Sequence, residues 1–309
     1  MDSTLQLLKI LAPIFAAVAL GLVAKRKQML SSEQVGGLQQ FAVKIGLPCV
    51  VFNACLTARI GAGELLNIGL GVTPVMLAAL WAFRERERKL KYHNLPQLFA
   101  AHETGMLGIP LTMALFGAAE SYRMGVLDLG QALVAFPTIA ILSSDTGDAP
   151  SVGKIIKGVL TSPLLIMSFL GLGLNLSGVA AWMEQTGVLP VVTEATGFLS
   201  QPVSALMLFS VGYHFSIDAN NRGDIFKVSG IFLAWFGVTG LIAQGVLALV
   251  PGVEPISRWV LLLYCLMPGS YLAPGLGRSE KDQILASGVC SVLTAVALAA
   301  FCVISAIVT

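Results

Sequence analysis

Long apolar stretches alternate with short polar ones along the whole of this chain. Ten of the apolar stretches are bounded by charged or turn residues, and each is about as long as the ~20 residues that an α-helix needs to cross a bilayer. The pattern predicts an all-α polytopic membrane protein with ten transmembrane helices and short connections. The predicted helices are Leu5–Ala24, Val35–Ala58, Glu64–Phe83, Leu95–Gly117, Tyr122–Ser143, Gly158–Leu176, Leu189–His214, Phe226–Val250, Trp259–Gly277 and Gln283–Val308.

The Lys and Arg residues fall unequally on the connections between these predicted helices. Cytoplasmic loops of membrane proteins carry the excess of positive charge. One side of the predicted topology receives only Arg59, Arg123 and Arg258, so we expect that side, with both chain ends, to face outward. The other side carries the remaining loop cations: Lys25, Arg26, Lys27, Arg84, Arg86, Arg88, Lys89, Lys91, Lys154, Lys157, Arg222, Lys227, Arg278 and Lys281.

Composition agrees with a membrane protein and excludes other classes. Of the 309 residues, 56% are hydrophobic and 12% are charged, against roughly 25% charged in an average soluble domain. The formal net charge of +2 gives no indication of a nucleic-acid partner. The cysteines lie inside apolar stretches without metal-ligand spacing, which predicts buried thiols and no metal site. They are Cys49, Cys55, Cys265, Cys290 and Cys302.

The two halves of the chain resemble each other at two places. FAVKIGLPCVVF (Phe41–Phe52) and FLSQPVSALMLF (Phe198–Phe209) have the same length between phenylalanines and a proline inside each. HETGMLGIP (His102–Pro110) and LMPGSYLAP (Leu266–Pro274) both carry a glycine, four residues and a proline. The similarity predicts an internal repeat of five helices.

Five is an odd number, so the second copy must enter the membrane from the opposite side. We therefore expect two inverted repeats, residues 1–145 and 155–309, as in many secondary transporters. Glycine and proline both disfavour a continuous helix, so paired interruptions of the fourth and ninth helices are expected near mid-membrane. Ordinary kinks are the alternative. The predicted break residues are Gly105, Gly108, Pro110, Pro268, Gly269 and Pro274.

Four stretches resemble the auxin efflux carrier family of permeases: LPCVVFNACL from Leu47, TGMLGIPLTMALFG from Thr104, VLDLGQAL from Val126 and MPGSYLAP from Met267. That family includes plant auxin exporters and bacterial carriers of malonate and related acids. The resemblance implies ten helices in two inverted repeats, with a scaffold and a transport bundle whose fourth and ninth helices cross, a fold similar to bile-acid sodium symporters and sodium/proton antiporters. It implies transport of small organic anions by alternating access. The chain departs from the usual family pattern at His102–Glu103.

Charged side chains inside membrane helices are costly and mark functional or structural sites. Glu103 directly precedes Thr104–Gly105, where its carboxylate can couple transport by holding a proton or cation, or can support the broken helix. Lys44 lies at similar depth and is either an ion-pair partner of Glu103 or a cation that attracts an anionic substrate. Its counterpart in the second half, Gln201, is uncharged and is also expected in the substrate and ion site. We expect Asp128 to pack or gate near the crossing.

Uncharged groups complete the predicted substrate and ion site. Half-helix N-termini suit a carboxylate, and freed carbonyl oxygens suit a cation. The residues expected to line the crossing are Asn53, Thr104, Gly105, Gly269, Ser270 and Tyr271.

The leading hypothesis is therefore a secondary active permease for a small organic anion. Coupling to H⁺ is placed slightly ahead of coupling to Na⁺, and a sodium symporter, a uniporter and a channel-like facilitator remain alternatives. An intramembrane enzyme is not expected, because His93, His102 and His214 lack the HExxH spacing of a metal site. ATP-driven transport is not expected either, because no Walker A motif is present. No cofactor is expected. The expected partners are the substrate anion, the lipid bilayer and a second copy in a homodimer, and the expected location is a bacterial inner membrane.

Overall fold

The computed structural model describes residues 2–58, 62–88, 92–144, 153, 161–216, 218 and 221–308. Within these ranges the secondary structure is helical, apart from one isolated antiparallel bridge between His102 and Gly269. This confirms the predicted all-α class. Lys89, Lys91, Lys154 and Lys157 of the predicted cytoplasmic side, and Arg59 of the other side, lie outside the described residues.

Six helices of the described part are long and apolar enough to cross a membrane, and a seventh results if one bent pair is counted as a single span. The bent pair is α9 (Pro163–Leu176) and α10 (Val179–Gln185), which meet at 72°. These helices confirm a polytopic membrane protein, and ten crossings stay a prediction. The six are Leu5–Arg26, Ser32–Leu56, Leu65–Glu85, Val188–His214, Arg222–Leu249 and Glu280–Val308.

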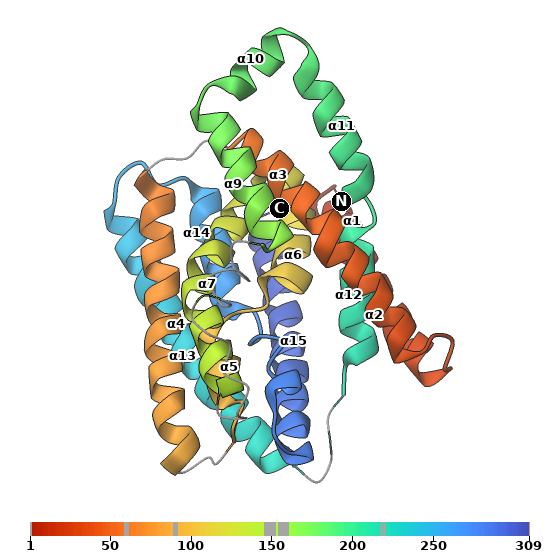
Figure 1. Cartoon of the computed structure of the whole chain (residues 1–309), viewed down its shortest axis with the longest axis vertical. Coiled ribbons are helices and arrows are strands. Elements are labelled where there is room, and N and C mark those ends of the chain that lie inside the picture. The colour runs from red at the N-terminus through yellow and green to blue at the C-terminus, as the bar shows by residue number, and fades with distance from the viewer. Residues whose placement is uncertain are drawn as a thin grey trace.

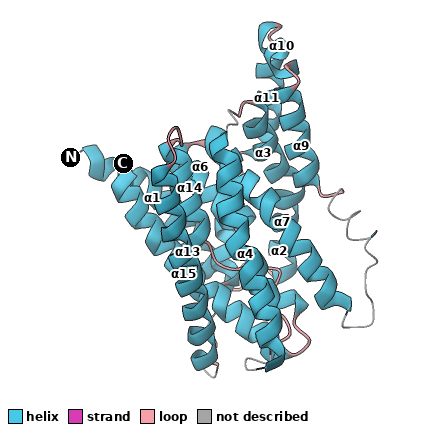
Figure 2. Ribbon diagram, turned by 90° about the vertical axis from the view of Figure 1, so that its left-hand side faces the viewer, coloured by secondary structure: helices cyan, strands magenta, loops and turns pink. Residues whose placement is uncertain are grey.

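A first group of helices, named here the α1 bundle, packs around two close pairs: α1 on α12 and α3 on α9. Its other members are α2, η1, α10 and α11, and α10 and α11 project beyond the remaining helices (Figures 1 and 2). The bounds are α1 Asp2–Arg26, α2 Ser32–Phe41, η1 Ala42–Gly46, α3 Leu47–Leu56, α11 Val188–Ser200 and α12 Val203–His214.

The α1–α12 pair is held at backbone contact by two glycines. A Cβ atom on Gly21 would lie 2.0 Å from the carbonyl oxygen of Phe209, and one on Gly212 would lie 2.0 Å from that of Val18. Small residues allow membrane helices to approach this closely. The two glycines therefore determine how these helices pack.

The second group, named the α4 bundle, contains the interrupted helices. α4 packs on α5 and α7, and α13 packs on α14 and α15. Each bundle contains the same helix contact twice. In the α1 bundle, the contact of α1 with α12 corresponds to that of α9 with α3. In the α4 bundle, the contact of α4 with α7 corresponds to that of α13 with α15. The bounds are α4 Ala62–Arg88, α5 Leu95–Ala100, η2 Thr104–Gly108, α6 Ile109–Phe116, η3 Ala118–Glu120, α7 Ser121–Ser144, α13 Arg222–Leu249, α14 Pro255–Leu266, η4 Pro274–Leu276 and α15 Glu280–Val308.

Prolines explain where the helical geometry changes. The π-helical turns η1 and η2 each end one residue before a hydrophobic residue and a proline, Leu47–Pro48 and Ile109–Pro110. Proline donates no backbone hydrogen bond and its ring crowds the carbonyl of the preceding turn, so a wider π turn accommodates it. The helix between Val188 and His214 is interrupted at Gln201–Pro202, between α11 and α12.

Candidate functional site

Two extended segments cross where the predicted fourth and ninth helices are interrupted. The first follows α5, where Ala101 has φ −159° and ψ 148°, and the second begins at Met267, with φ −66° and ψ 148°. The backbone N–H of Glu103 donates to the carbonyl of Pro268 at 2.8 Å. Gly269 is required for this approach, because a Cβ atom there would lie 2.3 Å from the Leu98 carbonyl oxygen.

The predicted break residues fall inside and outside these extended segments. Pro268 and Gly269 lie in the second segment, whereas Gly105, Gly108, Pro110 and Pro274 lie in the helical turns that follow the two breaks. Pro110 occupies the first turn of α6, where a missing N–H is tolerated. The interruption of the fourth helix therefore precedes its glycines and proline, at residues 101–103.

Gln131 on α7 binds the other edge of the first extended segment. Its Oε1 accepts from the backbone N–H of His102 at 2.8 Å, and its Nε2 donates to the His102 carbonyl at 2.9 Å. Oε1 also accepts from the Tyr264 hydroxyl at 2.9 Å, and Nε2 lies within bonding distance of Thr104 Oγ1 and Asp128 Oδ1. One buried side chain thus takes the place of a neighbouring strand.

Glu103 joins the two interrupted helices through both of its carboxylate oxygens. Oε1 accepts from the backbone N–H of Met106, in the first turn of η2, at 3.1 Å. Oε2 accepts from the backbone N–H of Tyr271, just beyond the other extended segment, at 2.9 Å. The carboxylate therefore occupies a position where freed N–H groups from both breaks converge.

Asp128 is the second carboxylate at the crossing. Its Oδ1 accepts from the Thr104 hydroxyl and from Gln131 Nε2, the latter at 2.9 Å. Thr104 begins η2, so Asp128 fixes that turn to α7. Its other oxygen, Oδ2, accepts no hydrogen bond from the described residues.

A cavity of about 730 Å³ lies against this crossing and reaches both bundles. Predicted site residues that line it are Lys44, Glu103, Thr104, Gly105, Asp128, Ser270 and Tyr271. Other polar residues of its wall were not predicted from the sequence: Gln39, Gln40, Gln97, Gln131, Ser162, Ser210, His214, Ser287, Ser291 and Thr294. For Gln131 a signal was present, because it follows Asp128 by three residues and so shares its helix face.

Three predicted site residues do not line the cavity. Asn53 instead joins α3 to α11, donating to the Thr193 carbonyl at 3.2 Å and accepting from the Thr196 hydroxyl at 2.6 Å. Gln201 is exposed at the turn between α11 and α12. Gly269 contributes to the crossing through its backbone, since it has no side chain to present.

Lys44 lines the cavity but does not pair with Glu103. Its side chain is exposed and donates to Gln40 Oε1, one turn earlier on the same helix, at 3.4 Å. Among the described residues neither Glu103 nor Asp128 forms an ion pair within 4.0 Å. The predicted Lys44–Glu103 pair is absent here, which leaves Lys44 free to meet an anion.

The His102 side chain packs among aromatic rings beside the crossing. Its ring lies between Phe236, Tyr264 and Phe232, with centroid distances of 4.3, 4.5 and 5.5 Å. Nδ1 lies 3.0 Å from the Met267 carbonyl oxygen. The imidazole thus packs the extended segment against α13 and α14.

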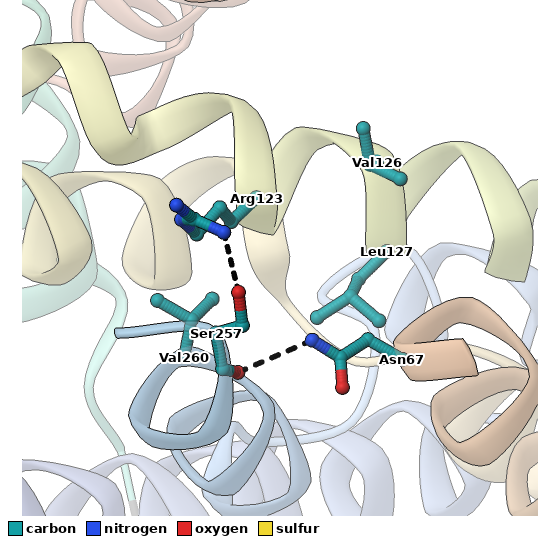
Figure 3. Close-up of a pocket in the computed structure, with 6 residues that line it drawn as sticks. All are labelled: Asn67, Arg123, Val126, Leu127, Ser257 and Val260. Atoms are coloured by element: carbon teal, nitrogen blue, oxygen red, sulfur yellow. Dashed lines mark hydrogen bonds between the residues drawn. The ribbon is translucent and has the colours of Figure 1, made fainter. Parts of the chain in front are cut away.

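The far end of the α4 bundle is held by Arg123, at the start of α7. Its guanidinium forms ion pairs with Glu120 and Glu254. It also donates to the Ser257 hydroxyl, and Asn67 donates to the Ser257 carbonyl (Figure 3). The adjoining space is only about 10 Å³, too small for a ligand larger than water. This cluster joins α4, α7 and α14.

Comparisons with known proteins agree with a transporter. Residues 7–144 match the protein family described as "Membrane transport protein". A protein of Methanothermobacter thermautotrophicus (strain Delta H), named as an uncharacterized transporter, is 26% identical over 283 residues, covering 89% of each chain. The first interrupted helix with Glu103, and α7 with Asp128 and Gln131, lie inside the family match.

Proposed function

We propose that this chain, which is similar to membrane transport proteins and resembles the auxin efflux carriers, is a secondary active permease for a small organic anion. In this proposal ten membrane helices form two inverted repeats, residues 1–145 and 155–309. The repeated contacts of α1 with α12 and α3 with α9, and of α4 with α7 and α13 with α15, support that arrangement.

The observation that carries the proposal is the cavity at the crossing. Its volume of about 730 Å³ lies within the roughly 300–1,000 Å³ of small-molecule sites. Lys44 from the α1 bundle and Ser270 and Tyr271 from the α4 bundle line the same space. A substrate bound there contacts both bundles, so movement of one bundle against the other would expose it to either side in turn.

The cavity extends toward the side expected to be cytoplasmic. Its wall includes Gln39 and Gln40 of α2 and His214 and Phe215 at the end of α12. The ends of α1 and α4 and the starts of α13 and α15, which carry the described loop cations, lie in the same half of the molecule, away from both chain ends (Figure 1). We therefore assign this conformation to an inward-facing state, with both termini outside.

Lys44 is the residue proposed to attract the substrate. It is the one cation among the Lys and Arg residues of the described cavity wall, and its ammonium makes a single long hydrogen bond, to Gln40. Glu103, in contrast, already accepts an N–H from each interrupted helix. These contacts favour a supporting role for Glu103 over the coupling role that was its alternative.

Uptake into proteoliposomes tests the proposal. Labelled malonate, malate and indole-acetate would be offered separately, with and without sodium and with and without an imposed proton gradient. The expected result is saturable uptake of at least one anion, driven by one of the two gradients. Saturable uptake that neither gradient changes would instead establish a uniporter. Absence of uptake for all three carboxylates would refute the proposal that small organic anions are the substrates.

The remaining parts of the proposal concern the cellular context. A bacterial inner membrane is proposed as the location and a homodimer as the assembly. Crosslinking in native membranes tests the second, because a homodimer predicts one product of twice the chain mass.

A further inference from the structure

Two carboxylates at the crossing lack a cationic partner. Glu103 and Asp128 both line the cavity, and among the described residues neither forms an ion pair. Charged groups inside a membrane protein normally pair with an opposite charge. Two unpaired carboxylates on one wall repel each other, so at least one of them requires a cation that the protein does not supply.

The two carboxylates differ in how many of their oxygens accept a hydrogen bond. Each Glu103 oxygen accepts one backbone N–H, and the two donors belong to different interrupted helices. Hydrogen bonds from N–H groups stabilise the ionised form of a carboxylate. In Asp128 both donors, Thr104 and Gln131, bind Oδ1, so Oδ2 has no donor among the described residues. Asp128 Oδ2 is therefore the carboxylate oxygen at the crossing that has no donor among the described residues.

An unpartnered amide on the same cavity wall is an independent indication of a polar ligand. Gln97 on α5 is fully buried and lines the cavity, yet neither its Nε2 nor its Oε1 makes a hydrogen bond in the described structure. α5 packs against α7, the helix that carries Asp128. Burying an amide without partners is costly, so such groups normally bind something.

We propose that Asp128 binds a monovalent cation, either H⁺ or Na⁺, through its free oxygen, with the Gln97 carbonyl oxygen available on the neighbouring helix as a further ligand. Carboxylate, amide and hydroxyl oxygens are the hard ligands that Na⁺ shares with other hard cations. A transition metal is not indicated, because the described residues contain no group of three His, Cys, Asp or Glu side chains arranged to hold one. Glu103 holds the two interrupted helices together through the N–H groups of Met106 and Tyr271.

The site connects cation binding to the crossing itself. Asp128 fixes Thr104 at the start of η2, and Gln131 fixes His102 in the extended segment. A cation that redistributes charge on Asp128 changes the acceptor strength of Oδ1 toward both donors. This deepens the proposed permease function, because it names the coupling site and the ion class.

Other titratable groups near Asp128 have to be separated from it in any test. Glu103 in the first extended segment and Tyr264 on α14 lie near enough to interact electrostatically with Asp128, and Lys44 lines the same cavity. The His102 ring packs against α13 and α14, and its backbone bonds to Gln131. A response that depends on Asp128 must therefore survive neutralisation of Glu103.

Thermal unfolding of the purified full-length protein in nanodiscs tests the site without any substrate. Sodium would be varied against choline at constant ionic strength, and pH would be varied between about 5.5 and 8.5. For a sodium site, saturating sodium should raise the Tm of the wild type by about 5 °C. For a proton site, Tm should respond to pH and not to sodium. Glu103→Gln should lower Tm and keep the response, Gln97→Leu should weaken it, and Asp128→Asn should abolish it.

Carbodiimide labelling covers the case in which Asp128→Asn does not fold. Dicyclohexylcarbodiimide modifies protonated carboxyl groups in apolar sites, and peptide mass spectrometry separates the peptides of Asp128 and Glu103. The proposal predicts modification of wild-type Asp128 that is suppressed by sodium, or by raised pH alone. Modification of Glu103 in place of Asp128, or an ion response that persists in Asp128→Asn, would overturn it. If no carboxylate is taken up but the Tm still responds to the ion through Asp128, the proposed substrate is refuted and the cation site is not.

Discussion

Replacement of Gln131 by leucine should destabilise the protein more than any other removal of a single buried amide. Leucine is similar in size and apolar, so the change removes hydrogen bonds with little change in packing. The two N–H groups of Gln131 are shared among three acceptors and its carbonyl accepts twice, so about four bonds exist at one time. At ~1 kcal/mol for each bond, the loss is about 4 kcal/mol.

The loss of stability in Gln131→Leu should be large because the buried partners of Gln131 cannot replace the lost hydrogen bonds with bonds to water. The backbone N–H and C=O of His102 and the hydroxyl of Tyr264 are buried, and each would lose its bond. Gln244→Leu on α13 is the matched control, because that amide donates a single bond, to the Arg258 carbonyl. Its expected cost is ~1 kcal/mol.

Thermal unfolding of purified protein at fixed lipid composition measures both variants. We expect the Tm of Gln131→Leu to fall by roughly 8–15 °C, and that of Gln244→Leu by roughly 2–4 °C. Equal shifts for the two variants would refute the reasoning that the Gln131 side chain substitutes for a strand at the crossing.

Three further predictions concern the packing of the bundles and the charges of the cavity. Gly21→Ala should lower the Tm by about 5 °C, because its Cβ would meet a carbonyl oxygen on α12, whereas Gly237→Ala should leave the Tm unchanged, since no atom lies within 4 Å of its Cβ position. Lys44→Gln should raise the KM for anion uptake about tenfold. Its effect on uptake should add to that of Glu103→Gln, because the two residues do not pair. A double variant whose uptake is closer to wild type than that of Lys44→Gln alone would show that the two residues do form an ion pair. Asn53→Leu should lower stability and leave the KM of the permease unchanged, because Asn53 bonds only within the α1 bundle; a raised KM would contradict its placement.

Helices and their interruptions were predictable from the sequence because both depend on local properties. Apolar length predicts a membrane helix, and the sequence similarity of the two halves predicts that the fourth and ninth helices are interrupted together. The position of the first interruption was not predictable to the residue, because it depends on tertiary bonds. Gln131 holds His102 extended, and Pro110 is accommodated by the π turn before it.

The site was predictable in part for a related reason. Glu103, Thr104 and Asp128 stood out as polar groups next to a break or inside an apolar helix, and they do line the cavity. Asn53 is also a polar residue inside an apolar helix, but the sequence does not show which neighbour its side of the helix faces. In the structure its side chain bonds to α11. Whether two charges of similar depth face each other depends on helix rotation, which is why Lys44 and Glu103 were plausible partners and are not paired.

In the proposed mechanism, substrate passes through the cavity at the crossing of the interrupted helices. Counterflow of labelled malonate in proteoliposomes, with wild type and Gly269→Ala compared side by side, tests it most directly. We expect saturable counterflow for the wild type and none for Gly269→Ala. A methyl group on residue 269 would clash with the Leu98 carbonyl oxygen and separate the two extended segments. Equal counterflow in both proteins, or a wild-type flux that rises linearly with concentration and shows no counterflow, would contradict it.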